Sequence, residues 1–101
     1  MNTELQIEKE IQDKGLNAPR LTPQLIDEVI VNESYHSLTD VLTVCVLTLR
    51  NGFTVTGESA CVSPANYNEE IGNKKAKEKA KEKIWVLEGY LLKQKLYEQG
   101  K

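Results

Sequence analysis

Apolar residues recur at helical spacing near the start of the chain. Ile7 and Ile11 lie four residues apart, so residues 3–14 are predicted to form a short amphipathic helix. A second helix is predicted over residues 22–31, because a threonine-proline pair suits its N-cap and first turn. The apolar face of this second helix would carry Leu25, Ile26, Val29 and Ile30.

The middle of the chain is rich in β-branched residues and holds the strongest turn signal. The Asn-Gly pair at 51–52 favours a tight hairpin, because both residue types tolerate positive φ. Residues 41–50 and 53–62 are therefore predicted to pair as antiparallel strands. A short edge strand over residues 35–38 would precede them.

The length of the hairpin loop decides the strand register. With only two loop residues, Thr48 would pair with Val55 and Val46 with Gly57. Both faces of the sheet would then be partly apolar, so we expect helices on one face and another element, or a second copy of the chain, on the other. Gly57 has no side chain to pack, which indicates a bulge or a close approach by a backbone or a ligand.

Residues 67–97 are predicted to form a long helix. Glu69 and Glu70 lie in its first turn, where the helix dipole favours acids. Apolar residues then recur in steps of three to five, which indicates one buried seam. Gly89 and its apolar neighbours widen that seam, so a kink or break is expected near residues 84–89. The seam consists of Ile71, Ala76, Ala80, Ile84, Leu87 and Leu91.

These elements predict an α+β fold. An antiparallel hairpin, with two or three strands in the sheet, would be packed by two N-terminal helices and a long C-terminal helix. The 101 residues leave room for one hydrophobic core, so residues 1–101 are predicted to be a single domain. No apolar run is long enough to span a membrane, and the N-terminus does not resemble a secretory signal, which favours a soluble intracellular protein.

The charges are unevenly distributed along the chain. Residues 1–33 carry seven acids and three bases, whereas residues 73–101 carry nine lysines and four glutamates. This split favours contact between the two ends within the fold or an oligomer, or a basic face left free for an anion. The lysine-rich run at 73–83 is typical of a solvated helix face. It has no interleaved arginine or aromatic residue, so nucleic acid is not an expected partner.

The titratable residues do not form a recognisable catalytic or metal-binding motif. His36 is the only histidine and has no serine or cysteine motif near it. Cys45 and Cys61 lack further ligands at zinc spacing, and each lies in a strand-like apolar run. Phosphate-binding loops and nucleophile elbows are also missing from the sequence. We therefore expect reduced thiols, no metal, no cofactor and no enzymatic activity.

Short motifs give the chain a family resemblance. APR, YH, NGF, GESAC, PAN and LEGYLL occur in this order between residues 18 and 92. With them the chain resembles a family of small phage and prophage proteins, named after gene product forty-nine of a coliphage and gene sixty-six of a Shigella phage. Val86 stands where family members often have proline, which favours a continuous helix. Lys77 and Lys79 replace an aromatic residue and an asparagine, and Tyr67-Asn68 replaces a Phe-Asp pair.

The resemblance implies a phage protein in the cytoplasm of an infected or lysogenic bacterium. In size and element order the family is similar to the phage Thoeris anti-defence proteins, which are sponges that sequester cyclic nucleotide immune signals at oligomer interfaces. This likeness rests on layout and phage context. It implies a non-catalytic sponge for a cyclic nucleotide or a cyclic ADP-ribose-type molecule. The alternative is an accessory protein that binds a host or phage protein or nucleic acid through the hairpin or the basic helix.

A sponge of this kind needs arginines for phosphates, an aromatic ring for a base and a crevice. The interhelix linker and the hairpin each supply one arginine, and the loop before the long helix supplies a tyrosine next to a helix N-terminus that favours anions. For each arginine, a plain surface charge is the alternative. The two arginines and the tyrosine are expected to share one crevice, within one chain or across a subunit boundary of a homo-oligomer. The candidate ligand-binding residues are Arg20, Arg50, Asn66, Tyr67 and Lys74.

Overall fold

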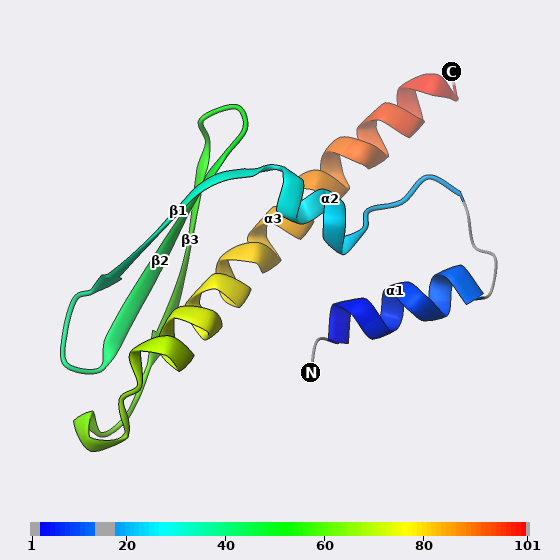
Figure 1. Ribbon diagram of the computed structural model, residues 1–101. Coiled ribbons are helices and arrows are strands. Elements are labelled where there is room, and N and C mark those ends of the chain that lie inside the picture. Colours follow the sequence, from blue (N-terminus) through cyan, green and yellow to red (C-terminus); the bar gives the residue numbers. More distant parts are fainter. Residues whose placement is uncertain (1–2, 14–17, 101) are drawn as a thin grey trace.

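The computed structural model describes residues 3–13 and 18–100, and it confirms the α+β class. One sheet of three antiparallel strands has the order β1-β2-β3, and the long helix α3 lies across one of its faces (Figure 1). The elements are α1 (Thr3–Asp13), α2 (Pro23–Glu28), β1 (Ile30–Ser37), β2 (Leu42–Leu49), β3 (Thr54–Ala60), the 3-10 turn η1 (Pro64–Asn66) and α3 (Glu69–Gln99). The last residue predicted for the first helix, residue 14, lies outside the described residues.

The β2–β3 hairpin has a three-residue loop. The Leu49 N–H donates to the Phe53 carbonyl at 2.8 Å, and the Gly52 N–H donates to the Leu49 carbonyl at 2.9 Å. Gly52 has a φ of 90°, the left-handed conformation that glycine adopts without strain. A turn closed by such a glycine matches the twist of the flanking strands. The predicted pairing of the two strands is confirmed, but the prediction of a two-residue loop is wrong.

The longer loop moves the strand register by one residue. Leu47 pairs with Val55 and Cys45 with Gly57, in place of the predicted Thr48–Val55 and Val46–Gly57 pairs. The observed register puts Val55 and Gly57 on the same face as the buried residues of β2. Burial against α3 therefore selects this register, because a slip by one residue would turn the apolar side chains of β3 to the face of the sheet away from α3.

The second helix is shorter, and the first strand longer, than the sequence predicts. Helix α2 ends at Glu28, not at residue 31, and β1 already begins at Ile30, not at Tyr35. Ile30 pairs with Leu49, and the Arg50 N–H donates to the Val29 carbonyl at 3.0 Å. Pairing with the whole length of β2 therefore outweighs the helical spacing of the apolar residues here. The β-branched sequence from 29 to 31 suits a strand.

Helix α3 packs so closely on the sheet that its backbone touches Gly57. A Cβ built on Gly57 would overlap the Ala76 carbonyl oxygen and the Ala80 amide nitrogen. Of the alternatives raised for Gly57, a bulge or a close approach by a backbone or a ligand, the close approach by a backbone is the one observed. The helix is continuous through Gly89, so the break expected near residues 84–89 is absent.

Ion pairs join the acidic and basic ends of the chain within the fold. The Lys77 ammonium lies 2.9 Å from the Glu33 carboxylate on β1, and the Lys81 ammonium lies 2.9 Å from the Asp27 carboxylate on α2. Contact within the fold, one of the alternatives suggested by the charge split, is therefore observed. Within the described parts of the chain, no helix has the length and apolarity to cross a membrane.

Candidate functional site

An open apolar cavity of about 550 Å³ lies between the hairpin turn and the C-terminal half of α3. Phe53 and Tyr90 present aromatic rings there, and they are 56% and 72% exposed. Arg50 and Glu88 are the two charged residues at the cavity. The lining residues are Val29, Leu49, Arg50, Asn51, Phe53, Val86, Leu87, Glu88, Tyr90 and Leu91.

The hairpin turn fixes the wall of the cavity that carries Arg50 and Phe53. The Arg50 N–H is bonded to the Val29 carbonyl, and the Asn51 Oδ1 accepts a hydrogen bond from the Phe53 N–H at 3.0 Å. Such a local side-chain bond stabilises the turn. Arg50 and Phe53 are therefore held by a hydrogen-bonded turn at the edge of the apolar cavity.

This arrangement suits a small molecule with an aromatic ring and an anionic group. Ligand cavities usually measure about 300–1,000 Å³ and combine apolar walls with a few polar groups. An aromatic side chain stacks on a planar base, and an arginine donates two parallel hydrogen bonds to a phosphate. Both kinds of group occur here within one cavity.

Tyr67 lies at the opposite end of the sheet and is bound to it. Its hydroxyl is 3.0 Å from the Ser37 hydroxyl on β1 and 3.0 Å from the Thr43 hydroxyl on β2. Thr43 is only 1% exposed, so its hydroxyl depends on this partner. Tyr67 therefore fastens the loop before α3 to the sheet. Its role in ligand binding remains a prediction.

Asn66 and Lys74 lie near the same end as Tyr67. Asn66 ends the exposed turn η1, and α3 begins three residues later with an N-cap, in which the Asn68 Oδ1 accepts a hydrogen bond from the Ile71 N–H at 3.0 Å. The Lys74 ammonium lies 3.5 Å from the Glu70 carboxylate, and both side chains are largely exposed. These contacts do not test the ligand-binding roles predicted for Asn66 and Lys74, which stay predictions.

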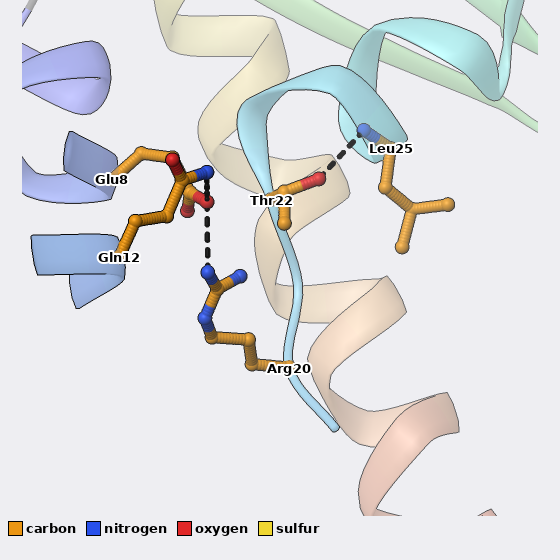
Figure 2. Close-up of polar contacts among 5 residues, drawn as sticks. All are labelled: Glu8, Gln12, Arg20, Thr22 and Leu25. Atoms are coloured by element: carbon orange, nitrogen blue, oxygen red, sulfur yellow. Dashed lines mark hydrogen bonds and ion pairs between the residues drawn. The ribbon is translucent and has the colours of Figure 1, made fainter. Parts of the chain in front are cut away.

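Arg20 is engaged in an ion pair with helix α1. Its guanidinium donates to the Glu8 carboxylate at 2.8 Å, and the Gln12 side-chain amide donates to the same oxygen at 2.8 Å (Figure 2). The Glu8 side chain is only 7% exposed and that of Arg20 is 26% exposed. Arg20 therefore compensates a buried negative charge, which links the interhelix linker to α1.

The three residues expected to share a crevice do not converge within one chain. Tyr67 is bonded to Thr43, whereas Arg50 follows Leu49 at the other end of β2, and six strand residues span about 20 Å. Arg20 lines a separate depression of about 570 Å³, on the side of α3 that faces the interhelix linker. A site that combines all three would need residues from a second chain.

Sequence reasoning missed the two aromatic residues of the cavity. Phe53 directly follows the hairpin turn, and its exposure, 56%, becomes visible only in the structure. Tyr90 lies in the apolar cluster that widens the predicted seam. Because α3 extends beyond the sheet (Figure 1), part of that seam faces the cavity instead of the core.

A small titratable cluster under α3 is structural. The Tyr35 hydroxyl donates to the Glu33 carboxylate at 2.9 Å. The pKa of Glu33 is lowered, chiefly by its hydrogen bond to Lys77, and burial raises the pKa values of Tyr35 and Cys45. A fully buried thiol with a raised pKa is a poor nucleophile. Among the described residues, no three His, Cys, Asp or Glu side chains come together as a metal site.

Fold and cavity thus define a small α+β protein with an open apolar cavity between a hairpin and a helix. The chain matches the Phage protein (N4 Gp49/phage Sf6 gene 66) family over residues 21–96. Because this match covers most of its length, the chain belongs to that family of phage proteins, and the resemblance of its motifs to this family is confirmed. No curated protein and no solved structure matches the chain.

Proposed function

We propose that this phage protein is a non-catalytic sponge that sequesters a nucleotide-type immune signal of the host. The expected ligand is a cyclic nucleotide or a cyclic ADP-ribose isomer. The observation that supports this function is the cavity of about 550 Å³, in which two exposed aromatic rings stand close to an arginine. Such a signal offers both a base to stack and phosphates to neutralise.

Arg50 and Phe53 have distinct roles in this proposal. Arg50 contacts a phosphate, and a hydrogen bond to a charged group contributes about 1.5–3 kcal/mol. Phe53 or Tyr90 stacks on the base, which contributes about 1–3 kcal/mol. Sequestration needs only such binding free energy, so the ligand should leave the protein chemically unchanged.

In this proposal, the remaining predicted site residues reach the ligand only from a second copy of the chain. Asn66, Tyr67 and Lys74 lie at the far end of the sheet from Arg50. They contribute to the same ligand only if a second copy places that end next to the cavity. A homo-oligomer is therefore part of the proposal, and Arg20 serves mainly to hold α1.

Calorimetry tests this function directly. The protein is titrated with a panel of cyclic dinucleotides, cyclic trinucleotides and cyclic ADP-ribose isomers. Arg50→Ala should weaken the binding of the preferred ligand by about 10- to 100-fold. Lys75→Ala is the matched control, because it also removes an exposed cation but lies outside the cavity lining. Circular dichroism verifies that both variants fold.

An absence of binding at about 100 µM ligand would overturn the sponge proposal, since weaker binding is not sequestration. One observation would then favour a macromolecular partner. Val86, Tyr90 and Leu91 are 72%, 72% and 58% exposed and form an apolar rim around the cavity. Exposed apolar patches of this kind often mark protein interaction sites.

A further inference from the structure

One face of the sheet has no cover among the described residues. Helix α3 packs against the odd-numbered residues of β2, whereas the even-numbered residues of β2 and β3, and those of β1 from Asn32 onward, point to the other side. We call these even-numbered residues, at 32–36, 42–48 and 54–60, the open face. No described helix lies on it (Figure 1).

The central strand of the open face has more apolar outward residues than a strand that faces solvent usually has. An antiparallel sheet with one solvated face normally shows polar residues there. Here the outward residues of β2 are Leu42, Val44, Val46 and Thr48. The flanking strands add mainly threonine, serine and alanine, and His36 and Glu58 are the two titratable residues among them. It also carries no lysine or arginine, whose charge would oppose burial of the face against another sheet.

The two titratable residues of the open face lie at opposite ends of one cross-strand row. His36 pairs with Val44, and Val44 pairs with Glu58, so the row runs across all three strands. In a two-fold arrangement about an axis parallel to the strands, β1 of one copy lies over β3 of the other. Each His36 then faces the Glu58 of the other copy, which gives two complementary contacts at the same level of the sheet.

The size of the open face fits a weak dimer. Three strands about 4.8 Å apart and seven residues of about 3.3 Å give roughly 330 Å² in plan for each copy. The accessible area exceeds the plan area, so the total buried area is on the order of the 1,000 Å² that a specific interface requires. Dissociation in the micromolar range is expected.

We infer that the open face is the contact surface of a symmetric dimer of this chain, with the two sheets stacked face to face and β1 opposite the partner copy's β3. Two-fold dimers are the most common soluble oligomers, and stacked sheets pack with their strands nearly aligned. This dimer is not the contact that the proposed function invokes, because a two-fold axis parallel to the strands keeps the Tyr67 end of each copy over the same end of the other, away from the cavity against α3.

Sedimentation velocity of the full chain, from about 1 to about 200 µM, tests the inference. The unmodified protein should pass from monomer to dimer over this range. Val46→Glu puts a charge at the centre of the open face and should give a monomer throughout. Thr56→Glu does the same from an exposed edge position and provides a second variant that should fold. A monomer at every concentration of the unmodified protein would overturn the inference.

Val86→Glu is the matched control, because it puts the same charge on an exposed apolar residue of α3. This variant should dimerise normally. If Val86→Glu is monomeric while Val46→Glu is dimeric, the copies associate through the helix, and the inference is overturned.

A charge exchange tests the orientation of the two sheets. His36→Glu should weaken the dimer, because it faces Glu58 of the other copy. The double variant His36→Glu with Glu58→His should restore it. Lys79 and Lys83 line the same depression as Glu58 at the edge of β3. Loss of Glu58 alone would also change the charge of that depression within one copy, so the exchange is the better test. A weakened dimer without recovery in the double variant would overturn the strand-parallel arrangement.

Discussion

Replacement of Gly57 by alanine should separate the sheet from its covering helix. The added methyl group would overlap the Ala76 carbonyl oxygen and the Ala80 amide nitrogen. Both atoms belong to the helix backbone, so they cannot rotate away as a flexible side chain can. Overpacking of a core usually costs about 1–3 kcal/mol, and more where a backbone must move. We predict that Gly57→Ala lowers the free energy of unfolding by at least about 3 kcal/mol.

Thermal unfolding followed by circular dichroism measures this loss. For a domain of this size each kcal/mol lowers Tm by about 4–8 °C, so Gly57→Ala should lower it by roughly 12–24 °C. Gly89→Ala is the control, since its Cβ would meet only the Leu21 Cδ1 at 3.8 Å, an ordinary contact. Alanine within a helix gains up to about 1 kcal/mol over glycine. A Gly57→Ala variant within about 0.5 kcal/mol of the parent would refute the close packing of α3 on β3.

Three further changes test the local contacts. Tyr67→Phe removes the hydroxyl that is hydrogen-bonded to the sheet, and chemical denaturation should show a free energy of unfolding lower by about 1–2 kcal/mol. If the ring were only exposed, the same change would leave the stability unchanged. Asn68→Ala removes the N-cap of α3 and should cost about 1 kcal/mol, with reduced helicity as a second readout. Burial raises the pKa of the Cys45 thiol, so the folded state keeps its proton while the unfolded chain loses it. Stability should therefore fall as the pH rises above about 8.5, and Cys45→Ala should flatten this slope. With a thiol reagent, Cys61 should react before Cys45, which is buried.

The strand pairing and the long helix could be predicted because their signals are local. The Asn-Gly turn and the β-branched run around it indicate the hairpin without reference to the rest of the chain. The spacing of Ala76, Ala80 and Ile84 marks the face of α3 that is buried in the structure. Gly57 indicated a bulge or a close approach, because glycine in a strand interior often marks one of the two, and the structure decides for the backbone of α3.

The end of α2 and the strand register depended on contacts that a local pattern does not contain. Val29 and Ile30 have both helical spacing and β propensity, and the pairing of Ile30 with Leu49 decides between the two. The number of loop residues in the hairpin is decided by which register buries Val55 against α3.

The candidate site was only partly predictable, because its residues come from distant elements. Arg50 was correctly placed on the hairpin turn, and the structure adds the cavity beside it. The sequence could not show that Arg20 is bound to Glu8, or that Tyr67 lies at the other end of the sheet. The residue types indicated which side chains have the chemistry to bind a nucleotide. Their positions relative to one another could be known only from the fold.

Native mass spectrometry after incubation with the nucleotide panel tests the central claim most directly. We predict that the protein retains one compound of the panel in a fixed ratio to the chain, and that denaturation releases this compound with its mass unchanged. Arg50→Ala should lose most of the retained compound at equal protein concentration. A protein that emerges without any retained nucleotide, or that releases a compound of altered mass, would contradict a non-catalytic sponge.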